Sequence, residues 1–192
     1  MSLEKVVSGG QRGVDQAALR AAKRAGLKLG GWCPPKFVCD SKSGLRLGKI
    51  PIALRIWLSE TRSPSGSSRQ APKIPRSERT QWNVRNSDAT LVLRYLDPDP
   101  DSTGIGTDWI DAGTAWTATS ALAYGRPLLV CDPRRDGCAT RIFDWLDALS
   151  VRILNVAGPS EKNAEGIGKI SEDLLYRVFV AGEARRKLGE NG

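Results

Sequence analysis

The chain has 192 residues, of which 40% are hydrophobic, and it carries a formal net charge of +8 at pH 7. This length suits a single folded domain, and this hydrophobic content is too high for an intrinsically disordered chain. No apolar run approaches the roughly 18 residues that cross a membrane, and no secretory signal follows Met1, so we expect a cytoplasmic protein with no membrane partner.

The cysteine and histidine content excludes several kinds of site. The chain has no histidine, so Ser–His and Cys–His nucleophile pairs are absent from it. No two of the four cysteines, Cys33, Cys39, Cys131 and Cys138, have the CxxC spacing of a structural zinc site. We therefore expect reduced thiols and no metal site built from them.

Predicted strands and helices alternate along the chain. Short apolar runs between glycines or prolines predict strands, and apolar residues at helical spacing predict helices. In chain order these are strand Lys5–Ser8, helix Val14–Ala25, strand Leu27–Trp32, helix Ser77–Ser87, strand Ala89–Leu93, helix Gly113–Tyr124, strand Pro127–Cys131, helix Ala139–Leu149, strand Arg152–Val156 and helix Gly168–Lys187.

The segments between these elements are less regular. Cys33–Ile50 is expected to be a loop, and Ile52–Leu58 fits either a strand or a helix. Residues 61–76 are rich in Ser, Pro and basic residues and predict a flexible surface insertion, and Asp97–Gly106 is expected to be a polar loop.

The alternation predicts an α/β fold in which helices cover both faces of a mainly parallel sheet of five or more strands. No internal repeat and no second core are visible, so residues 1–192 are expected to form one ligand-binding domain. In such sheets ligands bind beyond the carboxyl ends of the strands, where the direction of winding changes.

A glycine-rich turn, Ser8-Gly9-Gly10-Gln11-Arg12-Gly13, joins the first strand to the first helix. Glycines let the backbone approach a ligand closely, and the free N–H groups at a helix start bind anions. The glycines alone also fit a tight structural turn, but their place in a βα unit and the guanidinium of Arg12 favour a phosphate site. The turn is not GxGxxG, and no acidic residue ends the second strand, which argues against a dinucleotide-dependent dehydrogenase.

A second turn, Gly113-Thr114-Ala115, opens another helix. It offers further N–H donors and the Thr114 hydroxyl, although a plain helix cap fits the same residues.

Other side chains are candidates for the same pocket. Arg79 and Asn83 lie four residues apart on one helical face, and Arg85 lies close to them on that helix, so this polar face either lines the pocket or is solvated. Trp32, at the end of the second strand, either stacks on a flat heterocycle or belongs to the core.

Taken together, these segments resemble the molybdenum cofactor carrier proteins. The matching stretches keep the order of that family over about Val6 to Gly158; they are Ser8–Asp15, Gly30–Pro34, Leu58–Thr61, Arg79–Asp88, Gly113–Ala115 and Ile153–Pro159. The resemblance implies a Rossmann-like three-layer sandwich related to the "lonely guy" phosphoribohydrolases. It also implies a non-catalytic protein that holds and protects molybdenum cofactor (molybdopterin), a phosphorylated pterin with a dithiolene.

The resemblance further implies particular residues and partners. Ser8, Gly9, Gly10, Gln11 and Gly13, with Gly113 and Thr114, would form the anion-binding loops, and Arg79, Asn83 and Arg85 would flank them. A homo-oligomer, either dimer or tetramer, is implied, with molybdenum enzymes or cofactor-biosynthesis proteins as clients. This chain departs from the family at Arg12, where threonine is usual, and at Ala112, where a second glycine is common.

Other ligands and functions stay open. Molybdate, a pterin precursor or a nucleotide are alternative ligands, and hydrolysis of the N-glycosidic bond of nucleoside 5′-monophosphates is the alternative function. The related hydrolases carry a glutamate three residues after the threonine of their glycine motif, and Thr117 stands there in this chain, so the general acid/base has no obvious holder. The charge of +8 suggests nucleic acid, but no basic-aromatic or helix-turn-helix pattern supports that partner.

Overall fold

The central sheet has five strands, and all of them are parallel. The computed structural model describes residues 2–40, 47–62, 66–96 and 111–189. The strands are β1 (Lys5–Val7), β2 (Lys28–Gly30), β7 (Ala89–Leu93), β8 (Leu128–Cys131) and β9 (Ile153–Ala157), in the spatial order β2-β1-β9-β7-β8. The predicted α/β class and parallel sheet are therefore confirmed.

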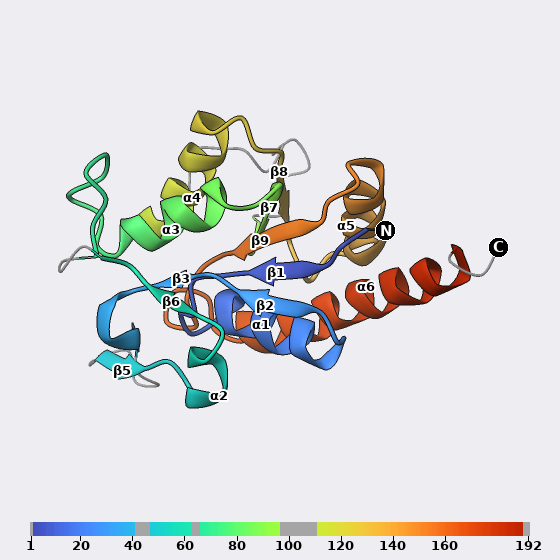
Figure 1. The fold of residues 1–192 in the computed structure, drawn as a ribbon, viewed down its shortest axis with the longest axis horizontal. Coiled ribbons are helices and arrows are strands. Elements are labelled where there is room, and N and C mark those ends of the chain that lie inside the picture. The colour runs from blue at the N-terminus through green and yellow to red at the C-terminus, as the bar shows by residue number, and fades with distance from the viewer. Residues whose placement is uncertain (1, 41–46, 63–65, 97–110, 190–192) are drawn as a thin grey trace.

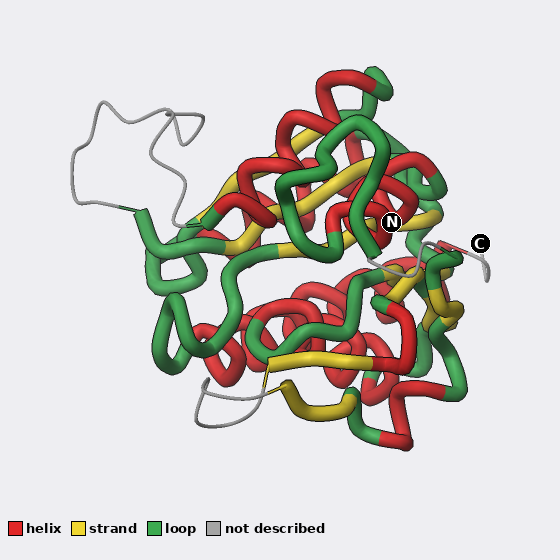
Figure 2. The backbone as a smooth tube through the Cα atoms, turned by 90° about the vertical axis from the view of Figure 1, so that its left-hand side faces the viewer, coloured by secondary structure: helices red, strands yellow, loops and turns green. Residues whose placement is uncertain are grey.

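Helices form a layer on each face of this sheet (Figures 1 and 2). The long helices are α1 (Val14–Arg24), α3 (Ser77–Arg85), α4 (Ala112–Ala123), α5 (Cys138–Ala148) and α6 (Ile167–Gly189). In Figure 1, α3 and α4 lie on one face, and α1 and α6 lie on the other. Each of the five predicted helices is present, with ends within two residues of the expected positions.

The last strand in the sequence, β9, lies between β1 and β7. It is in register with both, since Leu154 is opposite Val6 in β1 and Val156 is opposite Leu91 in β7. The chain leaves β1 toward β2 but leaves β7 toward β8, in the opposite direction. The winding therefore reverses around β9, and a ligand crevice is expected at the carboxyl ends of β1, β9 and β7.

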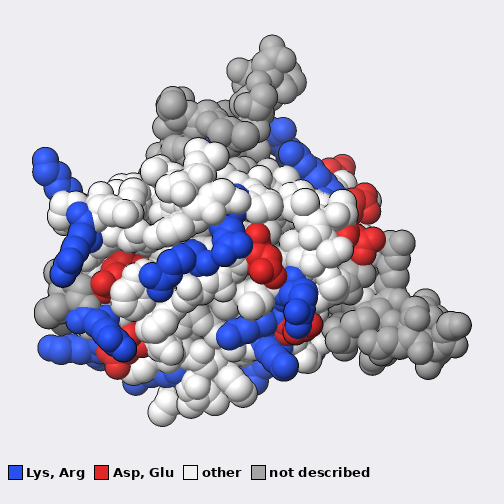
Figure 3. Space-filling model, turned by 45° about the horizontal axis from the view of Figure 1, so that its top comes forward, with Lys and Arg blue, Asp and Glu red and all other residues white. Residues whose placement is uncertain are grey.

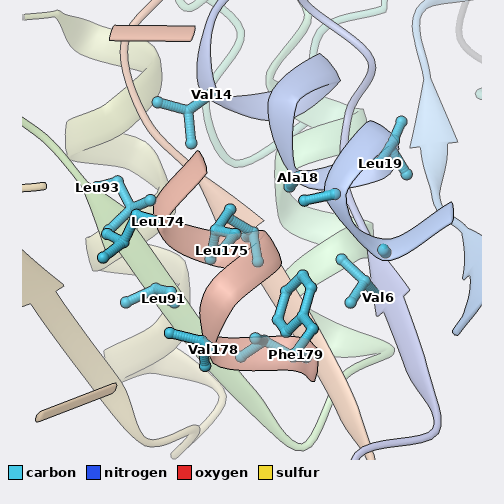
Figure 4. Packing of buried hydrophobic residues seen from close by; sticks show 14 of the residues in the cluster. Val6, Val14, Ala18, Leu19, Leu91, Leu93, Leu174, Leu175, Val178 and Phe179 are labelled. Atoms are coloured by element: carbon cyan, nitrogen blue, oxygen red, sulfur yellow. The ribbon is translucent and has the colours of Figure 1, made fainter. Parts of the chain in front are cut away.

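The core lies between the sheet and the α1–α6 layer (Figure 4). Helix α1 presents the fully buried small residues Ala18, Ala21 and Ala22, which allow close approach of neighbouring backbone. From α6, Leu175 and Phe179 fill the same layer and are fully buried. Burial of such side chains stabilises a fold by about 1.5–3 kcal/mol each, and it fixes the strand ends that carry the glycine turns.

Two small sheets extend the molecule at the carboxyl edge of the central sheet. They pair β3 (Trp32–Cys33) with β6 (Ser59–Glu60) in parallel, and β4 (Val38–Asp40) with β5 (Leu47–Lys49) in antiparallel fashion. A 3-10 turn, η1 (Pro35–Phe37), precedes β4, and the short helix α2 (Ile52–Arg55) precedes β6.

Two expectations for this region need correction, and one open alternative is resolved. Cys33–Ile50 is not simply a loop, because it contains β4 and β5. Their sequences, Val-Cys-Asp and Leu-Gly-Lys, lack the apolar run by which a strand is predicted. The predicted strand Leu27–Trp32 is divided at Gly31, whose φ of 132° interrupts the strand. Ile52–Leu58 begins as a helix rather than a strand.

The segment 66–76 lies against the start of α3. The Ser68 N–H donates to Ser77 Oγ at 2.8 Å, and the Ser68 hydroxyl donates to Gln81 Oε1 at 2.5 Å. Residues 63–65 of the predicted insertion and the predicted loop Asp97–Gly106 lie outside the described residues. The flexibility of the insertion and the single-domain organisation stay predictions.

Candidate functional site

A cavity of about 210 Å³ opens at the carboxyl edge of the sheet, where the winding reverses. Its walls come from the first glycine turn, the start of α3, the start of α4 and the end of β9. Six of the predicted site residues line it: Gly9, Gln11, Arg79, Asn83, Gly113 and Thr114. The fold thus brings both glycine turns and the polar face of α3 to one cavity.

The guanidinium of Arg79 crosses the first glycine turn. It donates from Nη1 to Asp15 Oδ2 at 2.8 Å, and a Cβ added to Gly9 would lie 1.6 Å from that same nitrogen. Gly9 is therefore the residue that leaves room for Arg79 to reach Asp15. The Arg79 side chain is 17% exposed and the Asp15 side chain 4%.

Asp15 also binds the backbone of the turn. Its Oδ2 accepts the Gln11 N–H at 3.2 Å, and the Ser8 N–H donates to the Gly30 carbonyl at 3.2 Å, so two of the six turn amides are already used inside the protein. Among the described residues, the N–H groups of Gly9, Gly10, Arg12 and Gly13 have no acceptor. Burial raises the pKa of Asp15 above its ordinary value, and Arg79 and the Gln11 N–H oppose that rise.

A second arginine enters the cavity from the residue before α3. Arg76 has a left-handed backbone, with φ of 61°, and its Nη1 donates to Gln11 Oε1 at 2.5 Å. The same guanidinium contacts Asp40 Oδ1 at 3.3 Å. Each of these two arginines thus pairs with an aspartate. Arg79 lies across the first glycine turn itself, and Arg76 reaches that turn through the side chain of Gln11.

The second glycine turn is capped by its own carboxylate. Asp111 accepts the Thr114 N–H at 2.8 Å and the Thr114 hydroxyl at 3.0 Å, and its carbonyl accepts the Ala115 N–H at 3.1 Å. The N–H groups of Ala112 and Gly113 have no acceptor among the described residues. This turn therefore presents two free amides, while Thr114 and Ala115 complete the helix cap.

Two residues of the first turn point away from the cavity. The Ser8 hydroxyl is buried and donates to the Val156 carbonyl at 2.7 Å. A Cβ added to Gly10 would lie 2.7 Å from Ile50 Cδ1 and 2.9 Å from Leu58 Cδ1, so this glycine packs on apolar side chains. Packing inside the protein therefore explains why a serine stands at position 8 and a glycine at position 10.

Four further predicted residues lie outside the cavity wall. Arg12 and Gly13 line a separate hollow between α1 and α6. The Trp32 ring meets the Trp82 ring edge-on, with centroids 4.7 Å apart, and Arg85 lies over the Trp82 ring at 5.4 Å. Their roles in ligand binding stay predictions.

The cavity also contains polar residues that the sequence analysis did not single out as ligand contacts. Asp15, Asp40, Arg76, Asn155 and Asn163 line it. Asp15 could have been singled out from the sequence, because it stands in the first turn of a predicted helix, where carboxylates are favoured. Asp40 ends the three-residue strand β4 and Arg76 precedes α3, and in neither segment does a periodic sequence pattern indicate the direction of a side chain.

Arg79 retains an unused donor. Its Nε is buried and has no acceptor within the described part of the chain. Because a buried donor without a partner is costly, this atom calls for an acceptor from a ligand or water. A phosphate or another oxyanion fits it, since guanidinium binds such groups through two N–H donors.

The remaining surface and the cysteines add no second centre of this kind. Basic side chains are interspersed with acidic ones on the face shown in Figure 3.

Within the described ranges, no group of three or more cysteine, aspartate or glutamate side chains is arranged to hold a metal ion. No described helix is both long enough and apolar enough to cross a membrane. Burial raises the pKa of Cys33 to about 12, so its thiol stays protonated.

Comparison with known proteins agrees with this architecture. A family model, the circularly permutated YpsA SLOG family, matches residues 6–179. A crystal structure of a protein from Syntrophus aciditrophicus SB, named "putative molybdenum carrier protein", is similar to this chain with a TM-score of 0.71 and 29% sequence identity. The similarity covers 93% of this chain and 96% of that one, and no curated protein matches. The chain belongs to the circularly permutated YpsA SLOG family.

Proposed function

We propose that this protein binds molybdenum cofactor as cargo and carries it, with the cofactor's phosphate beside Arg79. The observation that carries the proposal is the buried Nε of Arg79, a residue that lines the cavity: this nitrogen has no acceptor among the described residues. A phosphate there would accept from Nε and from the Gly9 N–H, which has no acceptor among the described residues and belongs to a residue that lines the cavity. The carrier name of the Syntrophus protein supports the same ligand class.

The polar walls of the cavity suit the rest of a pterin. Its amino-pyrimidinone edge offers N–H donors and acceptors, and carboxylate and amide side chains such as Asp40 and Asn163 match these groups. A volume of about 210 Å³ is below the roughly 300–1,000 Å³ of common ligand pockets. We therefore propose that the cavity takes the phosphate end and that part of the cofactor lies at its mouth.

A carrier is favoured over an N-glycosidic hydrolase by the residue at position 117. Thr117 lines the cavity, and its hydroxyl donates to the Gly113 carbonyl at 3.1 Å. This position supplies no carboxylate that could act as the general acid/base of such a hydrolase.

We propose further that the carrier is a homo-oligomer and hands its cargo to molybdenum enzymes or to cofactor-biosynthesis proteins.

The test is retention of cofactor by the purified protein. The protein is incubated under anaerobic conditions with cofactor released from a molybdenum enzyme and then separated by gel filtration. We expect molybdenum and oxidised pterin to elute with the protein in equal amounts, and release to be slower than decay of free cofactor. Elution of both with the small molecules would reject the proposal, and release of free base from AMP would support the hydrolase instead.

A further inference from the structure

We propose that Asp15 takes up a proton when an anion binds beside Arg79, so that affinity for the ligand depends on pH. This inference rests on the proposed function, because it assumes that the ligand presents an anionic group to Arg79. It assigns to Asp15 a positioning and proton-accepting role at the cavity.

The geometry leaves Asp15 with one counter-charge. Its Oδ2 lies 2.8 Å from Arg79 Nη1, and its side chain is 4% exposed, so little solvent screens the pair. The other groups that face it are polar and uncharged, namely the Gln11 N–H from the turn and Ser8 from the end of β1. Among the described residues, Arg79 is the one cation that compensates this carboxylate.

An anion at Arg79 has to share that counter-charge. The guanidinium keeps its proton in proteins, so its charge does not change when a second negative partner binds. The charge of Asp15 can change, because a carboxylate that is buried near another negative charge favours its neutral form. Protonation of Asp15 then leaves Arg79 free to bind the ligand through Nε and its remaining N–H groups.

The direction of the pH dependence follows from this coupling. Burial already raises the pKa of Asp15, and a bound anion raises it further. Between the two pKa values the complex holds a proton that the free protein lacks. Affinity therefore rises as the pH falls through this window, by at most about tenfold per pH unit. Above the window Asp15 is ionised in both states, and the ligand is held most weakly.

Sulfate is the suitable probe, because it stays a dianion across this range and contributes no proton of its own. Sulfate binding to the whole chain is measured by calorimetry at several pH values, in pairs of buffers with different heats of ionisation. We expect uptake of up to one proton per sulfate, seen as a difference in heat between the buffers. The Asp15→Asn variant should bind sulfate with no proton uptake and with little pH dependence.

The matched control is Glu4→Gln, which removes a surface carboxylate that pairs with Arg152 just before β1 and does not line the cavity. Proton uptake should persist in this variant. Sulfate binding without any buffer-dependent heat would overturn the inference and leave the anion site intact, and so would uptake that persists in Asp15→Asn. If sulfate does not bind at any pH, both the inference and the proposed site beside Arg79 fail. The wild-type buffer comparison decides the question even if Asp15→Asn does not fold.

Discussion

Asn83 holds the backbone of Trp32 from both sides. Its Oδ1 accepts the Trp32 N–H at 2.7 Å, and its Nδ2 donates to the Trp32 carbonyl at 3.0 Å. The contact ties α3 to β3 just after Gly31, where the strand is interrupted. Asn83 also lines the cavity, so one side chain links the wall of the site to the small sheet.

The Asn83→Asp substitution should therefore destabilise the fold. A carboxylate can still accept the Trp32 N–H, but it cannot donate to the Trp32 carbonyl, and it brings a charge to a site that is 2% exposed. The loss of a buried partner costs about 1–3 kcal/mol. Urea unfolding measures the change in the free energy of unfolding, and an unchanged midpoint would contradict this role.

The Gly9→Ala substitution should displace the Arg79 guanidinium from its place beside the cavity. The new methyl carbon would occupy the place of the guanidinium, which is the flexible end of a side chain, so the fold should survive. We expect sulfate affinity to fall about tenfold or more, as for loss of one charge-assisted hydrogen bond. In a double-mutant cycle with Arg79→Gln, the second change should add little, because both remove the same contact. Additive losses would show that Gly9 acts in another way.

Gly10→Ala should instead affect the fold. Gly10 has φ of 75°, and a methyl group there would press on Ile50 and Leu58. Backbone strain and overpacking together should cost about 2–4 kcal/mol. Gly26→Ala is the matched control, since Gly26 has φ of 78° with open space around it, and only the backbone cost of about 1 kcal/mol should appear. Equal losses in the two variants would argue against packing at Gly10.

Cys33 should make the protein less stable in alkali. Burial, followed by the charge of Glu60, raises the pKa of Cys33 from 9.0 to about 12 in the folded protein. Because the folded state favours the neutral thiol, its contribution is full below pH 9.0 and is lost as the pH rises toward about 12. The free energy of unfolding of wild type should fall more steeply over this range than that of Cys33→Ala. Parallel curves would show that Cys33 ionises normally.

The fold could be predicted largely from local patterns, but the order of its strands could not. Glycines such as Gly26 and Gly125 end helices, and the apolar runs between them match the strands. The insertion of β9 between β1 and β7 depends on pairings such as Val6 with Leu154, which no local pattern indicates. The small sheets escaped prediction because strands such as β5 (Leu-Gly-Lys) and β6 (Ser-Glu) have no apolar run.

The backbone turns that form the site could be predicted from the sequence, but most of its side-chain contacts could not. The two glycine turns do meet at one cavity, as parallel βα units require. The pairing of Arg79 with Asp15 spans 64 positions and could not be read from either neighbourhood. The edge-on contact of Trp32 with Trp82 could not be predicted either, because packing partners across elements depend on the tertiary arrangement, and ligand stacking by Trp32 stays a prediction.

The binding site can be located by a crystal structure of the protein soaked anaerobically with molybdenum cofactor. We expect phosphate density within hydrogen-bonding distance of Arg79 Nε and of the Gly9 N–H. Anomalous scattering from molybdenum should lie at the mouth of the same cavity. Cofactor density elsewhere on the molecule, with no ligand atom near Arg79 Nε, would show that the cofactor does not bind beside Arg79.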